Sequence, residues 1–311
     1  MNSSHSTPTT FASPVTGTPE VLWPAQALLG EGLCWSPSTR SIWWVDIFGK
    51  KLMNLALHSG ERREWMFDDM VSAVAERANG RGLIVSMQRG IAFFDPSTAR
   101  LDMLHAPEPQ LPGNRFNDGK CDAQGRYWSG TMDMACTAET GSVYRVTADG
   151  STTHIDCAWA AHFPVVNGPT WSIDGRRIWV NDTARNFMHT GDFDPATGSI
   201  TNMRVFMRLP KGQGYPDGMT TDAAGRLWVA HWSGACVTCH APDDGRELAR
   251  IELPTSNITN VAFGGADMTT LFITSASAEL SDEQASAQPL KGSLFMVKTD
   301  AVGIPAHRFA G

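Results

Sequence analysis

The chain has 311 residues, and its 42% hydrophobic fraction is enough for a large core. Its formal net charge of −7 argues against nucleic acid or anionic membranes as partners, because both bind concentrated Lys and Arg. No apolar run approaches the roughly 20 residues that a membrane-spanning helix needs, so no membrane contact is expected.

The first residues are rich in Ser, Thr and Pro, and they lack the basic start and apolar segment of a secretory signal. We therefore predict a disordered lead over residues 1–19 and one folded domain over residues 20–311. Without an export signal, a cytoplasmic location and reduced cysteines are expected. The lone Cys236-x-x-Cys239 pair is weak evidence for a metal or redox role, and no obligate protein partner is evident.

Six segments along the chain share a polar turn that leads into an aromatic or aliphatic strand. Each segment ends with a pair of apolar residues at the start of this strand. The last residues of the six segments are Trp43, Ile84, Trp128, Trp179, Trp228 and Phe272. Successive copies lie 41 to 51 residues apart, which is the period of a β-propeller blade. A third strand follows each copy, and fourth strands such as 62–67 and 247–253 complete the unit. We predict an all-β fold, a six-bladed β-propeller with four-stranded antiparallel blades, closed by residues 21–23 pairing with the last blade.

About a dozen residues before each strand-two aromatic lies the predicted start of the blade's innermost strand, beside the central channel. This channel position is polar in every copy: Glu31, Ser72, Asn117, Asn167, Asp217 and Asn260. Taken singly, Asn167-Gly168 and Pro216-Asp217-Gly218 read as ordinary turns. Ordinary turn residues should lie at irregular distances from the strand-two position, whereas these six residues keep a nearly constant distance from it. We therefore interpret them as oxygen groups converging on the channel axis.

Carboxylate and amide oxygens form a hard donor set that suits Ca²⁺, Mg²⁺, Mn²⁺ or Fe²⁺. No His or Cys cluster shares the register, which disfavours a closed structural zinc site. With few protein ligands, positions would remain for water and substrate, as metal-assisted hydrolysis requires.

Five ordered segments carry a resemblance to a known family: residues 29–32 (LGEG), 114–120 (NRFNDGK), 130–132 (GTM), 166–168 (VNG) and 216–219 (PDGM). Together they resemble the regucalcin (senescence marker protein 30), gluconolactonase and sugar-lactonase family over about residues 21 to 297. The resemblance implies hydrolysis of an aldono-1,4- or 1,5-lactone with one divalent metal ion, and Ca²⁺, Zn²⁺, Mn²⁺, Mg²⁺ and Fe²⁺ all stay open. It implies that Glu31, Asn167 and Asp217 hold the metal.

By the same resemblance, Asp217 also handles the proton, and Arg115 and Asn117 bind the sugar hydroxyls. One position departs from the pattern: the family has a substrate-contacting glutamate shortly after Gly-Thr-Met, where this chain has Ala135. Asp133 is the nearest acid and a weak candidate for that role. Two alternatives stay open, a paraoxonase-like or phosphotriesterase-like hydrolase on the same fold and a non-catalytic metal-binding propeller.

Overall fold

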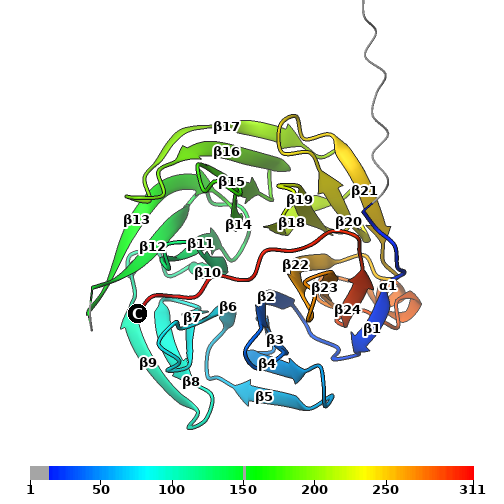
Figure 1. The fold of residues 1–311 in the computed structure, drawn as a ribbon, viewed down its shortest axis with the longest axis horizontal. Coiled ribbons are helices and arrows are strands. Elements are labelled where there is room, and N and C mark those ends of the chain that lie inside the picture. The colour runs from blue at the N-terminus through cyan, green and yellow to red at the C-terminus, as the bar shows by residue number, and fades with distance from the viewer. Residues whose placement is uncertain (1–13, 150–151) are drawn as a thin grey trace, which may run out of the picture.

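The computed structural model describes residues 14–149 and 152–311. Within them, twenty-four strands form six four-stranded antiparallel sheets arranged as blades around a central channel (Figure 1). The innermost strand of each blade lines the channel, as the repeat predicts. The predicted six-bladed β-propeller is confirmed.

In blades 1 to 5 the strands run from the channel outward in chain order, whereas the outermost strand of blade 6 is β1. Blade 1 comprises β2 (Gly30–Ser36), β3 (Ser41–Asp46), β4 (Lys51–Ala56) and β5 (Arg62–Met66); blade 2 comprises β6 (Val71–Glu76), β7 (Leu83–Met87), β8 (Ile91–Asp95) and β9 (Arg100–His105). Blade 3 comprises β10 (Asn114–Cys121), β11 (Tyr127–Asp133), β12 (Gly141–Asp149) and β13 (Thr152–Phe163); blade 4 comprises β14 (Val166–Trp171), β15 (Arg177–Asp182), β16 (Phe187–Phe193) and β17 (Ile200–Arg208). Blade 5 comprises β18 (Tyr215–Thr221), β19 (Leu227–Trp232), β20 (Cys236–His240) and β21 (Glu247–Glu252); blade 6 comprises β22 (Ile258–Gly264), β23 (Thr270–Ser275), β24 (Leu294–Lys298) and β1 (Glu20–Trp23).

The ring closes where the two ends of the chain meet in blade 6. Strand β1 pairs with β24, with Val21 opposite Phe295, as predicted for residues 21–23. Upstream, the amide of Gly17 donates to the carbonyl of Lys298 at 2.9 Å, so the end of the predicted lead runs beside the last strand. Residues 1–13 of that lead lie outside the described residues.

One short helix, α1 (Asp282–Ala287), interrupts the connection between β23 and β24, residues 276–293. A capping box between Ser281 and Gln284 satisfies its first backbone amides. The side-chain oxygen of Gln288 accepts from the amide of Ser256 at 2.7 Å and ties the connection to the body of the propeller. No helix in the described part of the chain has the length and hydropathy to span a membrane.

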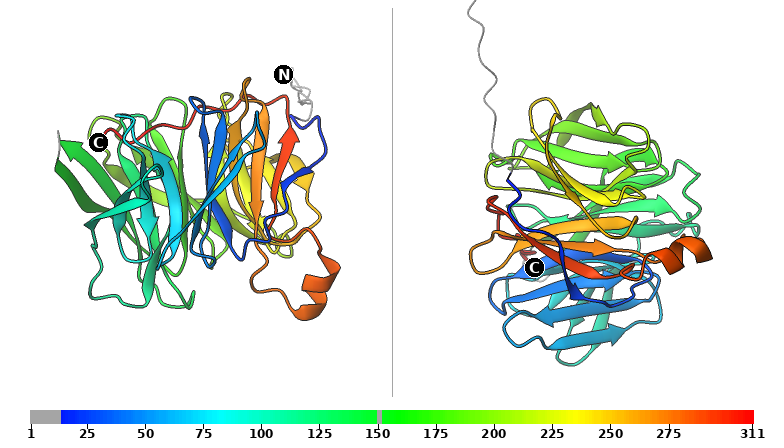
Figure 2. Two further views of the ribbon diagram at one scale, coloured as in Figure 1. Left: turned by 90° about the horizontal axis from the view of Figure 1, so that it is seen from below. Right: turned by 90° about the vertical axis from the view of Figure 1, so that its right-hand side faces the viewer.

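The C-terminal segment, residues 299–311, crosses the opposite end of the channel from α1 (Figure 2). Its backbone joins two distant blades: Val302 accepts from Ala223 at 2.7 Å, and Phe309 donates to Glu76 at 2.8 Å. A cavity of about 450 Å³ lies at this end, bordered by Lys120, Trp171 and Ile304 among others. The predicted site residues lie at the other end, where the inner strands begin.

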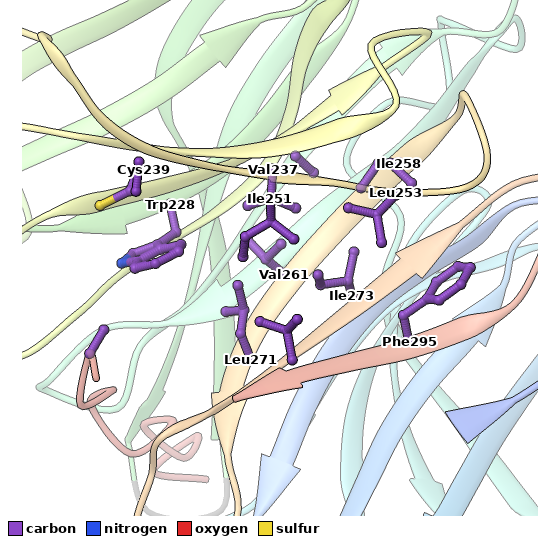
Figure 3. Close-up of a cluster of buried hydrophobic side chains, with 14 of the residues drawn as sticks. Trp228, Val237, Cys239, Ile251, Leu253, Ile258, Val261, Leu271, Ile273 and Phe295 are labelled. Atoms are coloured by element: carbon purple, nitrogen blue, oxygen red, sulfur yellow. The ribbon is translucent and has the colours of Figure 1, made fainter. Parts of the chain in front are cut away.

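Apolar side chains fill the space between neighbouring blades. Figure 3 shows one such cluster, in which Trp228 and Ile251 of blade 5 pack near Val261 and Leu271 of blade 6. Fully burying an aliphatic side chain contributes roughly 1.5–3 kcal/mol relative to leaving it exposed. This packing fixes the relative positions of the inner strands, and therefore of the side chains that enter the channel.

Candidate functional site

Every innermost strand has a register irregularity at the predicted channel position. The shifts fall between Glu31 and Cys34, Val71 and Ala73, Phe116 and Gly119, Asn167 and Thr170, Pro216 and Met219, and Ile258 and Val261. A β-bulge leaves a residue outside the ladder and re-aims its side chain. All six channel residues lie at or beside these irregularities and are buried.

Glycine follows several of the channel residues because the local backbone needs it. Gly32 has a φ of 62° and Gly168 a φ of 84°, in the left-handed region that favours glycine. A Cβ on Gly218 would collide with the side-chain amide of Asn260 from the neighbouring blade. The Glu-Gly, Asn-Gly and Asp-Gly pairs therefore serve bulges and close strand approach inside the channel.

A chain of hydrogen bonds links three blades across the site. Arg115 Nη1 donates to Asn117 Oδ1 at 2.6 Å, and Asn117 Nδ2 donates to Asn167 Oδ1 at 2.7 Å. Asn167 Nδ2 then donates to Thr183 Oγ1 at 2.9 Å, and that hydroxyl donates to the carbonyl of Pro216 at 2.7 Å. Because arginine can only donate, the chain has one direction. It orients the Asn167 amide oxygen and leaves that oxygen a second lone pair.

Three buried carboxylates lie close enough for their charges to repel: the predicted Glu31 and Asp217, together with Asp118. Asn260 Nδ2 lies 2.9 Å from Glu31 Oε2 and 3.4 Å from Asp118 Oδ1, and so spans the channel between blades 6 and 3. Asp118 Oδ2 accepts from the amide of Gly168 at 3.1 Å. Five of the six channel positions thus contribute to one cluster.

The sixth channel residue, Ser72, stays apart from this cluster. Its hydroxyl faces the carbonyl of Ser86 at 3.4 Å within its own blade. The shared register therefore predicts where each side chain starts, but it does not predict that every one of them joins the site.

Burial and mutual repulsion make the three carboxylates unusually reluctant to ionise. Burial, with the charge of Asp118 adding to it, raises the pKa of Glu31 to about 8. Burial also raises the pKa of Asp217 well above its ordinary value, and the charges of Glu31 and Asp118 add to that effect. Burial likewise raises the pKa of Asp118, against the opposing charge of Lys120. Such a cluster is stabilised by a cation that neutralises the repulsion.

The donor set fits a divalent metal ion. Glu31 and Asp217 supply anionic oxygens, and the oriented Asn167 amide supplies a neutral one. Within the described ranges, no three His, Cys, Asp or Glu side chains form a metal-binding group by themselves. A metal at this place would therefore use the amide oxygen, as the predicted set of Glu31, Asn167 and Asp217 does.

Three further residues of this region lie outside the predicted set of metal and substrate ligands: Asp118, Lys120 and Asn260. Lys120 is half-buried, and its Nζ donates to the carbonyl of Met219 at 2.6 Å, two residues after Asp217. The signal for Asp118 and Lys120 was their charge within a buried inner strand. For Asn260 the signal was its register with the other five channel residues.

Asp133, the weak candidate for substrate binding, lies at the end of β11. Its Oδ2 accepts from the amides of Thr137 and Ala138 at 3.0 and 2.8 Å. These hydrogen bonds lower its pKa and stabilise the β11–β12 loop. Contact between Asp133 and a substrate stays a prediction.

Cys236 and Cys239 lie in β20 as free, buried thiols. Burial raises their pKa values to about 11 and about 12, so both are protonated at neutral pH. Metal binding and thiol chemistry require the thiolate, so the structure offers no support for either at this pair.

Comparison with known proteins identifies the relatives of this chain. Residues 29–277 match the family described as SMP-30/Gluconolactonase/LRE-like region. Regucalcin of Gallus gallus is 32% identical, and the alignment covers 91% of this chain and 95% of that protein. L-arabinolactonase of Azospirillum brasilense is also 32% identical, over 91% of this chain and 92% of its own.

A solved structure of a calcium-binding regucalcin from Agrobacterium tumefaciens is 30% identical, with a TM-score of 0.86 over 96% of this chain and 100% of that one. The family match and the similarity to these relatives extend over most of the propeller. The chain therefore belongs to the SMP-30/gluconolactonase/LRE-like family.

Proposed function

We propose that the protein is a metal-dependent lactonase that hydrolyses an aldono-1,4- or 1,5-lactone to its sugar acid. The observation that carries the proposal is the meeting of three buried carboxylates with the oriented Arg115–Asn117–Asn167 chain at one end of the channel. The lactonase among the relatives supports the reaction class. The small-molecule lactone is the only partner that the function needs.

Glu31, Asn167 and Asp217 would hold the metal ion. When bound, a divalent ion supplies Lewis-acid polarisation of the lactone carbonyl and lowers the pKa of water. Ca²⁺ is the first ion to test, because the structurally similar regucalcin is described as calcium-binding.

Asp217 moves the proton. One Oδ atom of its carboxylate takes a proton from the attacking water as the water oxygen bonds to the carbonyl carbon. The same group returns the proton to the ring oxygen as the acyl C–O bond breaks, which yields the carboxylic acid and a new hydroxyl. Burial and the charges of Glu31 and Asp118 raise the pKa of Asp217 in the metal-free site, and a bound cation would favour the ionised carboxylate that accepts the proton.

Arg115 and Asn117 bind and orient the sugar. Nη1 of the guanidinium donates to Asn117 and to the carbonyl of Phe116, and no described residue accepts from Nη2 or Nε, which can donate to substrate hydroxyls. A planar fork of donors holds a polyol in a defined orientation, whereas an apolar ester offers it no partner.

A pH-indicator assay tests the function. Pentono- and hexonolactones are compared with an aryl ester and a phosphotriester, using metal-stripped protein supplied in turn with Ca²⁺, Zn²⁺, Mn²⁺, Mg²⁺ and Fe²⁺. We expect turnover of sugar lactones above the spontaneous rate, lost on chelation and restored by metal. Faster turnover of the aryl ester or the phosphotriester supports the paraoxonase-like alternative. Metal binding without any turnover supports a non-catalytic propeller.

A further inference from the structure

The β23–β24 connection, residues 276–293, begins at the rim of the site. The amide of Ala278 donates to the carbonyl of Leu28 at 2.9 Å, and Asn257 Nδ2 donates to the carbonyl of Ala278 at 3.0 Å. Leu28 and Asn257 each lie three residues before a channel residue, Glu31 and Asn260 respectively. The residue after Ala278 is therefore held at the mouth of the channel.

That residue is Glu279, and its backbone is in the left-handed region with a φ of 60°. This conformation is uncommon for a residue other than glycine, so the anchored connection imposes it. The side chain is exposed, and its carboxylate makes no hydrogen bond or ion pair to any described residue. Glu279 thus presents an unpaired acceptor at the rim.

The charge of Glu279 acts on the opposite side of the mouth. It is among the charges that influence Arg115 of β10 and Cys136 of the β11–β12 loop. Both belong to blade 3, which faces blade 6 across the ring (Figure 1). The hydrogen bonds of Ala278 therefore hold Glu279 at the rim of the channel, near enough for its charge to influence Arg115, although α1, three residues later, lies at the outer edge.

Arg115 offers matching donors from its side. The side chain is buried, yet Nη1 makes both hydrogen bonds that Arg115 donates within the described residues, to Asn117 and to the carbonyl of Phe116. Arg115 forms no ion pair with any described carboxylate within 4.0 Å. The Glu279 carboxylate thus acts on the Arg115 guanidinium through its charge, with no ion pair between the two. A hydroxyl, which both donates and accepts, suits the space between them.

We propose that Glu279 is a specificity-determining residue that accepts hydrogen bonds from substrate hydroxyls remote from the reacting carbonyl, opposite Arg115. This inference rests on the proposed function. It predicts that the enzyme selects polyhydroxylated lactones partly through a residue of blade 6, outside the carboxylate cluster.

The test compares Glu279→Ala with Glu283→Ala on two kinds of lactone. Glu283 is an exposed glutamate on α1 of the same connection and is the matched control. For a hexono- or pentonolactone, we expect Glu279→Ala to lower kcat/KM about tenfold, mainly through KM, because a charge-assisted hydrogen bond is lost. For γ-butyrolactone, which has no hydroxyl, both variants should match the unsubstituted protein. Glu279→Gln, which keeps an acceptor, should fall between.

Equal losses on both kinds of lactone, or no loss on either, would overturn the role of Glu279. Calorimetric binding of 1,5-anhydroglucitol, an uncharged cyclic polyol without an ester, provides a readout that does not depend on turnover. Glu279→Ala should weaken this binding about tenfold and Glu283→Ala should not. Unchanged binding in Glu279→Ala, or none in the unsubstituted protein, counts against the inference. Absence of lactone turnover in the unsubstituted protein counts against the proposed function alone.

Discussion

Glu31 and Asp217 carry the same charge in the same cluster, but their surroundings differ. Glu31 Oε2 is held by the side-chain amide of Asn260 and by the amide of Gly32. The Asp217 carboxylate receives a hydrogen bond from the backbone of Gly218, and its own carbonyl is fixed by Asn181 Nδ2 at 2.6 Å. Asp217 therefore has a fixed backbone and a carboxylate to which no side chain of the described residues donates a hydrogen bond.

This difference predicts distinct effects of two charge-removing substitutions. Glu31→Gln should weaken metal binding, and raised metal should largely restore kcat. Asp217→Asn should remain about a hundredfold slow in kcat even at full metal occupancy, because general-base assistance supplies about 10² to 10⁴-fold. The measurement is kcat alongside direct determination of bound metal. If saturating metal restores both variants equally, Asp217 is a ligand alone, and Asp118 becomes the next candidate for the proton acceptor.

The sequence predicts the ring of channel residues but not all of its neighbours, and Asp118 shows why. Successive side chains of a regular strand point to opposite faces, so a residue directly after Asn117 is expected to face away from the channel. The irregularity between Phe116 and Gly119 breaks that alternation, and both Asn117 and Asp118 enter the site. A bulge depends on the partner strand, which the local sequence does not contain.

Among the elements, the hairpins between the first two strands of blades 3 and 5 share one buried arrangement. In blade 5, Asp222 Oδ2 accepts from Arg226 Nε at 2.7 Å and from Trp228 Nε1 at 2.8 Å. The residues Asp122, Arg126 and Trp128 repeat this arrangement in blade 3. Blades 1 and 4 have serine at the turn, Ser36 and Ser172, and there Trp43 and Trp179 have a buried indole N–H without a partner among the described residues.

Removing Asp222 should therefore destabilise the protein strongly. Asp222→Ala leaves Arg226 and the Trp228 indole without their acceptor, and breaking a buried charged pair costs about 3–5 kcal/mol. Asp222→Ser copies the residue of blades 1 and 4 and should cost less. The control is Asp174→Ala in the blade 4 turn, an exposed carboxylate that, among the described residues, accepts only from Ser172 Oγ and the amide of Arg176 and whose loss should cost about 1 kcal/mol. Urea unfolding measures all three, and equal effects of Asp222→Ala and Asp174→Ala would contradict the assignment.

Strand positions were predictable because each blade repeats the same turn and aromatic strand. The β23–β24 connection was not, since α1 is six residues long and has no buried face that would give an apolar period. Its position over the mouth depends on hydrogen bonds from Ala278 to Leu28 and from Asn257 to Ala278, partners far apart in sequence.

At the scale of the whole molecule, the ring is closed twice. Strand β1 completes blade 6, and residues 299–311 then cross the channel to blades 2 and 3, where Phe309 is fully buried. Phe309 packs in a cluster with Ile84, Tyr127 and Val146. The second closure lies at the end of the channel away from the carboxylates.

Phe309→Ala should therefore separate stability from activity. Loss of a buried phenylalanine costs about 3–5 kcal/mol, which a lowered Tm will report. Because the substitution is remote from the site, kcat and KM at 25 °C should stay within about twofold for the folded protein. A fall in kcat without a fall in Tm would show that the C-terminal segment acts on the site instead.

The carboxylate cluster also predicts how the stability of the metal-free protein depends on pH. Glu31 has a pKa of about 8 in the folded state against 4.5 for an ordinary glutamate, and the pKa values of Asp118 and Asp217 are also raised. Between pH 4.5 and about pH 8, Glu31 therefore binds more protons in the folded state than in the unfolded state. This stabilisation is complete below pH 4.5 and is lost as pH rises through 8, by at most about 1.4 kcal/mol per pH unit for one proton.

The buried histidines change the stability of the protein with pH in the opposite direction, and they do so in a lower pH range. Burial lowers the pKa of His231 to about 4, so its contribution is full above 6.5 and is lost as pH falls through 4. From about pH 7.5, where an ordinary histidine has lost nearly all of its proton, to pH 8 the carboxylate effect dominates, and the Tm of chelator-treated protein should fall as pH rises. Saturating Ca²⁺ should remove or reverse this slope, because a cation binds the ionised carboxylates and stabilises the folded state more at higher pH.

Glu31→Gln should flatten the metal-free slope, whereas Glu64→Gln, at an exposed ion pair with Lys51, should leave it unchanged. A metal-free Tm that is constant or rises from about pH 7.5 to 8 would mean that the three carboxylates do not share a buried, repulsive site.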